Sequence, residues 1–183
     1  VVVEGGGTGV QEFLKAAHPS VRWMTAEDGW GFSKINNEAA KTSETEFILL
    51  LNNDTISRKG FLEKMLAAMK PDVGIVGAKL LHIDSTIQHI GVVFSSDGIP
   101  NHLGYNRPDD GTYAPAERSD YYDAVTFACA LIRREVWDKV CGLDEDYDFN
   151  YEDVDFCMKA REAGYRCWVE MSARITHLED KSR

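Results

Sequence analysis

Three groups of polar residues have the types and spacing that could support chemistry. The first, Asn52-Asn53-Asp54, follows directly on the apolar run at residues 47–51. In open α/β sheets, ligands collect beyond the carboxyl ends of the strands, and a carboxylate there can hold a divalent cation while substrate phosphates supply further ligands. Asn and Asp are also common turn formers, and Asp54 or Thr55 could cap a following helix. Taken alone, the triplet is more typical of a turn.

The second group is the acidic pair Glu152-Asp153, and the third is His177 near the end of the chain. A carboxylate can accept the proton that a hydroxyl group loses when it attacks a carbon atom. Acids in the first turn of a helix also complement the helix dipole, which is the simpler interpretation of the pair. Glycoside hydrolysis also uses two carboxylates, but they must flank the scissile bond several ångströms apart, which adjacent residues cannot do alone.

The elements that must position these residues alternate between strands and helices. Apolar patterns and breakers predict strands at residues 1–4, 21–25, 47–51, 73–81, 87–94, 124–132 and 165–170. They predict helices in the segment before Pro19, weakly within 31–44, and at 58–69, 134–140 and 152–163. The run at 47–51 lacks alternation, which indicates a strand covered on both faces, as in a parallel sheet. We therefore expect an α/β fold with a mixed, mainly parallel sheet flanked by helices.

Composition limits the classes of protein that the chain can represent. With 183 residues, 44% of them hydrophobic, the chain can form one domain with a substantial core. A formal charge of -10, with no basic patch evident, argues against nucleic acid or an anionic membrane surface as a partner. The chain has no C-x-x-C pair among its cysteines, Cys129, Cys141, Cys157 and Cys167. This spacing indicates buried thiols and a cytoplasmic location. The chain opens on a strand without methionine, so we expect a fragment of a longer protein.

Residues 149–177, “FNYEDVDFCMKAREAGYRCWVEMSARITH”, combine the acidic pair, an amphipathic helix, a glycine, a strand and His177. This order resembles the family 2 glycosyltransferases, nucleotide-sugar-dependent enzymes of the GT-A fold, and especially the bacterial rhamnosyl- and galactofuranosyl-type members. The resemblance spans most of the chain. “VVVEGGGTG” is similar to the family's second strand and “VDNGSTDG” turn, “GWGFSKINNEAA” to “NxGFAxGNNxG”, and “LLLNNDT” to “LLLNPDT”. “AVTFACALIRREVWDKVCGLDEDY” resembles “VTGACLLIRREVFEEVGGFDE”, and “YEDVDFCMKAREAGYR” resembles “YEDVDLCLRLREAGYR”.

The resemblance implies inverting, metal-dependent transfer of a sugar from a UDP- or dTDP-sugar to a saccharide or lipid-linked acceptor in cell-surface polysaccharide synthesis. Asp54, in the family's variant of the D-x-D motif, and His177 would bind Mn²⁺ or Mg²⁺, which neutralises charge on the leaving diphosphate. Asp153 would be the general base, with Glu152 orienting the acceptor or its loop. The helix dipole is expected to depress the pKa of Asp153, and late proton transfer makes such a weak base sufficient. His177 can alternatively be a structural histidine.

The resemblance also divides the single domain, residues 1–183, into a nucleotide-sugar-binding half at 1–95 and an acceptor and catalytic half at 96–183. Glu4 would read the base, Lys34 would reach a phosphate unless it is an ordinary solvated residue, and small residues such as Ala128 would let backbone approach the donor. Further donor-binding residues are Asn37, Asn52 and Asn53. The segment 96–119, rich in Gly, Pro and Asp, is expected to close over the acceptor with His102, Tyr105 and Tyr113.

Departures from the family pattern leave alternatives open. No segment like the family's first strand, “VSIVIPTYN”, precedes “VVVEGGG”, so a catalytically silent nucleotide-sugar-binding or scaffold domain is the main alternative. The spacing at 144–155 imitates a calcium-binding EF-hand loop, but Phe149 replaces the required glycine and Asp155 the final glutamate. A homo-oligomer, and peripheral association with the inner membrane face through regions outside this chain, are both compatible with the resemblance.

Overall fold

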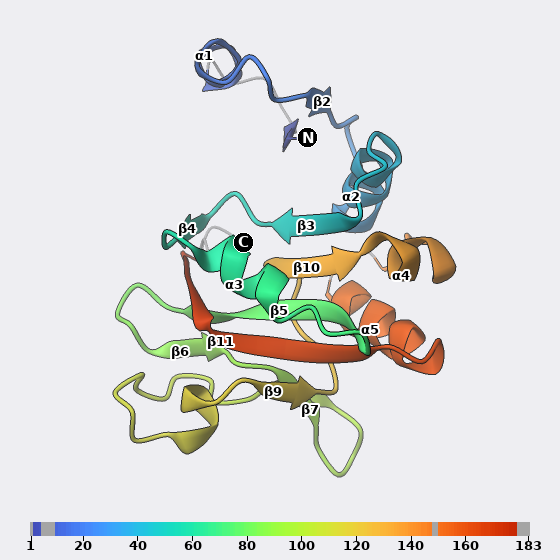
Figure 1. Ribbon diagram of the computed structural model, residues 1–183. Helices are drawn as coiled ribbons and strands as arrows, with labels where there is room; N and C mark the ends of the chain where they lie inside the picture. The colour runs from blue at the N-terminus through green and yellow to red at the C-terminus, as the bar shows by residue number, and fades with distance from the viewer. Residues whose placement is uncertain (1, 5–9, 148–149, 179–183) are drawn as a thin grey trace.

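A computed structural model describes residues 2–4, 10–147 and 150–178 of the chain (Figure 1). The helices are α1 (Val10–Ala17), α2 (Phe32–Lys41), α3 (Phe61–Ala67), α4 (Arg134–Lys139), α5 (Glu152–Glu162) and the 3-10 turn η1 (Ala114–Glu117). The strands are β1 (Val2–Glu4), β2 (Trp23–Thr25), β3 (Phe47–Leu51), β4 (Thr55–Ser57), β5 (Val73–Leu81), β6 (Ile87–His89), β7 (Val92–Phe94), β8 (Pro100–His102), β9 (Asp120–Tyr122), β10 (Cys129–Arg133) and β11 (Arg166–His177).

A seven-stranded sheet in the order β3-β10-β5-β11-β4, with β6 on β5 and β9 on β11, forms the centre of the molecule. This confirms the α/β class, but the expectation of a mainly parallel sheet is wrong. Within this sheet only β5 and β11 pair in parallel, and the remaining pairs are antiparallel. A parallel pair needs a long crossover connection, whereas β5 passes to β6 through the short turn at 82–86, which permits only an antiparallel pair.

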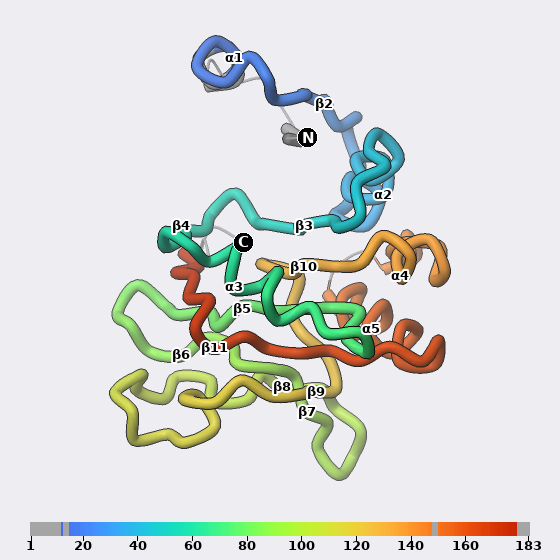
Figure 2. The backbone as a smooth tube through the Cα atoms, in the orientation of Figure 1, coloured from blue at the N-terminus to red at the C-terminus, as the bar shows by residue number. Residues whose placement is uncertain are grey.

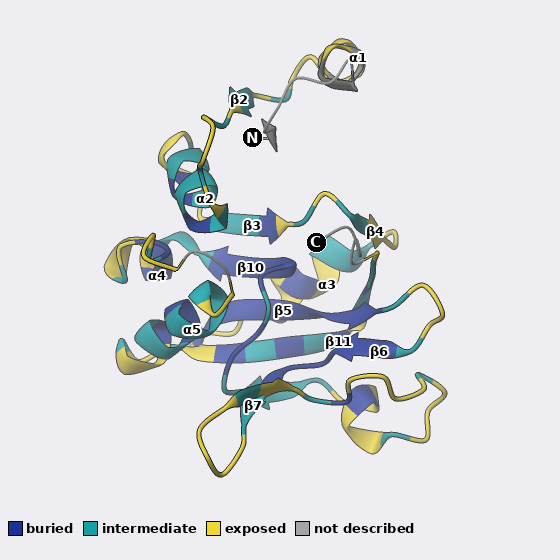
Figure 3. Cartoon of the chain, turned by 180° about the vertical axis from the view of Figure 1, so that it is seen from behind, coloured by how far each residue is buried: buried dark blue, intermediate teal, exposed yellow. Residues whose placement is uncertain are grey.

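The core lies on both faces of β5, whose nine residues are all buried (Figure 3). One apolar cluster joins the sheet to α3 through Met65 and Ala68, and a second joins it to α4 and α5 through Trp137 and Phe156. Figures 1 and 3, which are opposite views, show α3 on one face and α5 on the other. Burial on both faces thus belongs to β5, because α3 covers one face of the sheet at this strand and α4 and α5 cover the other.

The expectation that residues 47–51 are covered on both faces is wrong. In the part of the chain that is described, β3 forms the edge of the large sheet, and Leu51 is 43% exposed. β1 and β2 pair in parallel as a separate two-stranded sheet, and Figure 2 shows β2 outside β3, away from the rest of the large sheet. Among the described residues, no strand pairs with β3 on the side opposite β10.

Several elements differ in extent from the sequence-based predictions. The predicted strand at 87–94 is divided into β6 and β7 at Gly91, whose φ of +125° favours glycine and where a Cβ atom would lie 2.3 Å from the Tyr122 ring. The strand predicted at 124–132 is the shorter β10, and the helix predicted at 58–69 is the shorter α3. β4 was not predicted. β11 extends to His177, well beyond the predicted 165–170, through a register shift against β5 between Glu170 and Arg174.

The long segment at 96–119 is anchored to the sheet by buried charges. Lys79 of β5 is fully buried, forms an ion pair with Asp109, and donates a hydrogen bond to the carbonyl oxygen of Ala116, 2.9 Å away. Arg174 of β11 lies 3.3 Å from the same Asp109. A charge buried in this way needs such partners, and removing one is costly. The segment, which also contains β8 and η1, is therefore held in place beside the sheet.

Candidate active site

A cavity of about 1230 Å³ brings most of the predicted site residues together. Its walls come from the end of β3, from β7 and β8, from the segment before β10, and from the start of α5. The predicted residues that line it are Asn52, Asp54, His102, Tyr105, Ala128, Glu152, Asp153 and His177. Both predicted halves of the chain thus contribute to one cavity.

Asp54 and His177 are brought together by strand pairing. β4 pairs antiparallel with β11 so that Thr55 lies opposite His177, and the Leu178 N–H donates to the Asp54 carbonyl oxygen at 2.8 Å. The carboxylate Oδ1 of Asp54 consequently lies 3.1 Å from Nε2 of His177. The side chains are 29% and 14% exposed, so the pair lies at the cavity wall and is not sealed in the core.

Gln88 determines which nitrogen of His177 carries the proton. Nδ1 of His177 lies 2.8 Å from Oε1 of Gln88, and an amide oxygen can only accept, so Nδ1 must donate. An Nε2 atom without a proton would face the Asp54 carboxylate with a lone pair at 3.1 Å, an approach that is favourable only when a cation lies between the two groups. A second partner that fixes the tautomer of an imidazole is a common feature of metal-binding histidines. Gln88 was missed from the sequence, although a polar residue inside the apolar strand pattern at 87–94 is the signal that could have indicated it.

The donor set at Asp54 and His177 fits a divalent cation. Carboxylate oxygen and imidazole nitrogen are both ligands that Mn²⁺ accepts. Among the described residues no group of three or more His, Cys, Asp or Glu side chains could hold a metal ion. The protein would thus supply two ligands from this pair, and substrate phosphates and water would supply the others.

Asp153 lies at the start of α5, after a turn in which Asn150 and Tyr151 have φ values of +65° and +70°. Its carboxylate accepts hydrogen bonds from the N–H groups of Val154, at 2.8 Å, and Phe127, at 3.3 Å. Burial raises the pKa of Asp153 above its ordinary value, against the opposing effect of these hydrogen bonds. The expectation of a depressed pKa is therefore wrong, because the effect of burial exceeds the stabilisation of the charge, and Asp153 is a stronger base than predicted.

Glu152 lines the same cavity beside Asp153. One of its carboxylate oxygens, Oε2, is buried and has no hydrogen-bond partner among the described residues. Burial, and then the charge of Asp153, raise the pKa of Glu152. Buried polar atoms in folded proteins are nearly always paired, so this oxygen is available for a ligand.

The residues predicted to bind the donor do not all reach the cavity. Asn52 donates its backbone N–H to the carbonyl oxygen of Ala128 at 2.9 Å, and both residues line the cavity. Asn53 is exposed and, like Lys34, is not among the described residues of the cavity wall. The amine of Lys34 instead lies 3.1 Å from Glu38 and 3.3 Å from Glu145. Glu4 ends β1, but its side chain and the glycine-rich turn at 5–9 lie outside the described part of the chain.

Asn37 is buried and connects α2 to the turn after α4. Its Oδ1 accepts from the Leu143 N–H at 2.8 Å, and its Nδ2 donates to the Leu143 carbonyl at 2.8 Å and to Glu145 Oε1 at 2.9 Å. These bonds use both ends of the amide. The side chain is thus bound within the protein, whereas the resemblance had implied contact with the nucleotide.

Replacing Asn37 with alanine should lower stability, because both backbone groups of Leu143 would lose a buried partner. We expect a loss of roughly 1–3 kcal/mol, which corresponds to about 2–4 °C in Tm per kcal/mol. Thermal unfolding measures this, with Asn36→Ala as the matched control, since Asn36 donates to the Phe32 carbonyl oxygen of its own helix. An unchanged Tm together with weaker nucleotide-sugar binding would instead support a direct donor contact.

The calcium-loop alternative is disfavoured by the contacts of its acidic residues. The amine of Lys159 lies 3.1 Å from Oδ2 of Asp144 and 2.7 Å from Oδ2 of Asp155. A cation of the protein itself thus lies between the first and last acids of the supposed loop. Residues 148 and 149 of that loop lie outside the described part of the chain.

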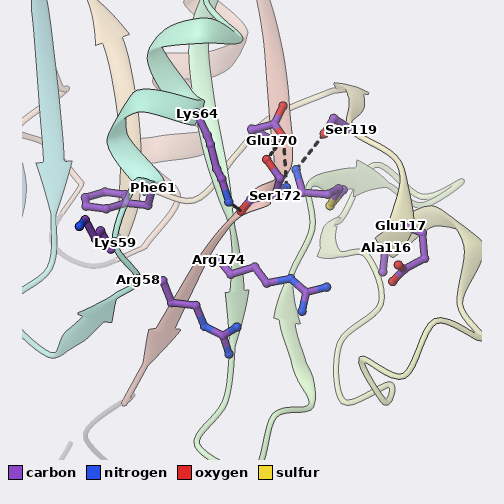
Figure 4. Close-up of a pocket in the computed structure, with 11 residues that line it drawn as sticks. Arg58, Lys59, Phe61, Lys64, Ala116, Glu117, Ser119, Glu170, Ser172 and Arg174 are labelled. Atoms are coloured by element: carbon purple, nitrogen blue, oxygen red, sulfur yellow. Dashed lines mark hydrogen bonds between the residues drawn. The ribbon is translucent and has the colours of Figure 1, made fainter.

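A second hollow, of about 410 Å³, gathers four cations that were not grouped from the sequence: Arg58, Lys59, Lys64 and Arg174 (Figure 4). Of the described residues, none lines both cavities. Lys64 donates to the Ser172 carbonyl oxygen at 2.8 Å, while Glu117 and Glu170 add negative charge to the wall. The chain therefore does form a local basic patch, because β11 brings Arg174 beside the segment before α3.

Two solved structures have the same fold as this chain. GalNAc-T7 with UDP, GalNAc and Mn²⁺ gives a TM-score of 0.70 at 11% identity, over 92% of this chain and 34% of that one. The mannosyltransferase PcManGT from Pyrobaculum calidifontis, with GDP-Man and Mn²⁺, gives 0.65 at 15% identity, over 98% and 47%. The fold is therefore that of the GT-A glycosyltransferases. No helix among the described residues has the length and apolar character to cross a membrane.

The sequence comparisons identify the family. The profile described as “Glycosyltransferase like family 2” matches residues 1–183, and the chain belongs to this family. The O-antigen biosynthesis protein RfbC of Myxococcus xanthus is 32% identical over 170 residues, which is 90% of this chain. The chain spans only 13% of that relative's length and 19% of another relative's.

Proposed function

We propose that this domain transfers a sugar, with inversion and with the help of a divalent metal, from a nucleotide diphospho-sugar to a saccharide or lipid-linked acceptor in cell-surface polysaccharide synthesis. The observation that carries the proposal is that Asp153 and the Asp54–His177 pair line one cavity. Membership of the glycosyltransferase family and the similarity to RfbC support the reaction class and the polysaccharide setting.

Asp54 and His177 would hold Mn²⁺ or Mg²⁺. When bound, the ion supplies positive charge that stabilises the leaving nucleoside diphosphate. Gln88 keeps the proton of His177 on Nδ1, so Nε2 is free to act as a ligand. Asn52 and Ala128, adjacent on the same wall, are the proposed donor contacts.

Asp153 would accept the proton of the acceptor hydroxyl as its oxygen forms the new bond to the sugar carbon and the bond to the diphosphate breaks. Attack from the face opposite the leaving group inverts the configuration of that carbon. The raised pKa of Asp153 brings it closer to the operating pH, which favours a general base. Glu152, with its unpaired buried oxygen, would hold another hydroxyl of the acceptor.

Titration calorimetry with UDP-, dTDP- and GDP-sugars tests this function. We expect binding of at least one donor in the presence of Mn²⁺, and affinity at least about tenfold lower with a chelator, because Asp54 and His177 would hold an ion whose charge attracts the donor phosphates. Binding of none of them with Mn²⁺ would remove the proposal. Metal-dependent binding without transfer to any acceptor would instead favour the silent-domain alternative.

A further inference from the structure

His89 and His102 form a side-chain pair at the cavity wall, and neither has a role in the proposed mechanism. His89, on β6, is fully buried, whereas His102, on β8, is exposed and lines the cavity. Their Nδ1 atoms lie 3.3 Å apart, and the rings meet edge to face at 72° with centroids 4.8 Å apart. Two Nδ1 atoms at this distance must share one proton, since two lone pairs or two N–H groups would repel each other.

The backbone determines which ring supplies that proton. The N–H of Thr126 donates to Nε2 of His89 at 3.3 Å, and a backbone N–H has no acceptor role. Nε2 of His89 is therefore unprotonated, and the single proton of the neutral ring lies on Nδ1. Nδ1 of His89 then donates to Nδ1 of His102. As a result, neutral His102 carries its own proton on Nε2.

Burial keeps His89 in the required neutral form. Removal from water holds the pKa of His89 well below its usual value. A charged His89 would carry a proton on both nitrogens and would lose the hydrogen bond from Thr126. The hydrogen bonds of the two rings therefore require neutral His89 with its proton on Nδ1.

The pair is connected to Asp153. The side chain of Thr126 hydrogen-bonds to Asp153, which favours the ionised carboxylate. His102, Thr126 and Asp153 all line the cavity. His102 thus lines the same cavity as the proposed base, and its tautomer depends on His89, which is not among the described residues of the cavity wall.

We propose that the Nε2–H of His102 donates a hydrogen bond to an oxygen of the acceptor sugar beside the hydroxyl that Asp153 deprotonates, and that His89 is a positioning residue that fixes this tautomer. The inference rests on the proposed function, because it assigns the acceptor to this cavity. A neutral N–H donor recognises a hydroxyl or ring oxygen of the sugar. An acceptor deoxygenated at that position would lose the contact.

The tautomers are measurable without any activity. Long-range ¹H–¹⁵N spectra of the full chain, which has five histidines, should show His89 protonated on Nδ1 and His102 protonated on Nε2 at neutral pH. Spectra of His89→Asn and His102→Gln assign the signals. A proton on Nε2 of His89, or on Nδ1 of His102, would overturn the inference.

Kinetics with octyl glycosides as acceptors test the contact itself. His102→Ala should lower kcat/KM for the acceptor about tenfold, mainly through KM, with unchanged donor affinity. His102→Gln should retain more activity than His102→Asn, because only the glutamine amide reaches the Nε2 position. His18→Gln, at an exposed histidine outside the cavity, is the control. Equal acceptor KM for wild type and His102→Ala would contradict the proposal.

Two amide replacements at His89 distinguish a role in fixing the tautomer of His102 from a role in packing alone. His89→Asn keeps an amide N–H near the Nδ1 position and should preserve the acceptor KM better than His89→Gln, which reaches only the Nε2 position. If the wild type binds a nucleotide sugar but transfers to no octyl glycoside, the proposed function is at fault. In that case the NMR spectra still test this inference. They report the two tautomers, and the His102 Nε2–H signal should shift when octyl glycoside is added.

Discussion

Replacing Asp153 with asparagine should reduce sugar transfer by roughly 10²- to 10⁴-fold while donor affinity stays unchanged. The amide keeps the size of the side chain but cannot accept the proton of the acceptor hydroxyl. Initial rates with saturating nucleotide sugar measure the loss, and calorimetry measures the donor affinity. Because burial raises the pKa of Asp153, the wild-type rate should fall as the pH is lowered through a value above the ordinary ~3.9 of an aspartate.

The matched control is Asp155→Asn. Asp155 lies in the first turn of the same helix, but it forms an ion pair with Lys159 at 2.7 Å and is not among the described residues of the cavity wall. Its replacement changes the helix charge equally and should leave the rate within about twofold, because the side chain lies outside the cavity wall. Equal rates for wild type and Asp153→Asn would exclude Asp153 as the base.

Replacing Asp54 with alanine should weaken Mn²⁺-dependent donor binding by more than about 100-fold, since even the outer partners of metal ligands are commonly worth roughly 10- to 100-fold. The loss should disappear in a chelator, because Asp54 would act through the metal. Gln88→Leu should cause a smaller loss of the same kind, since it releases the tautomer of His177. Calorimetric titration with and without Mn²⁺ measures all three affinities.

An exposed aspartate supplies the control for this experiment. Asp97 lies in the turn after β7, outside the cavity wall that the described residues form, and Asp97→Ala should bind donor as the wild type does. If Asp54→Ala and the wild type have the same affinity in Mn²⁺, Asp54 is not a ligand. His177→Ala then shows whether the histidine binds metal without it.

The sequence by itself determined the chemical types at the site and the order of the five α-helices and most of the longer strands. Asp54 and the Glu152-Asp153 pair were identified because each has a local signal, an apolar run before it or a helix start, and His177 was identified through the order of motifs in the family resemblance. Such signals involve neighbours along the chain, so one sequence can reveal them. The family resemblance rests on the same local motifs, and the family is confirmed.

The tertiary structure alone decided what surrounds these groups. The 3.1 Å approach of Asp54 to His177 depends on the pairing of β4 with β11, and the sequence pattern predicted neither β4 nor the full length of β11. The raised pKa of Asp153, the internal bonds of Asn37 and the His89–His102 pair depend on burial and on partners distant in the chain. Solvation and hydrogen-bond geometry are set by residues that meet only on folding, so the sequence pattern could name these groups but could not assign their protonation states or contacts.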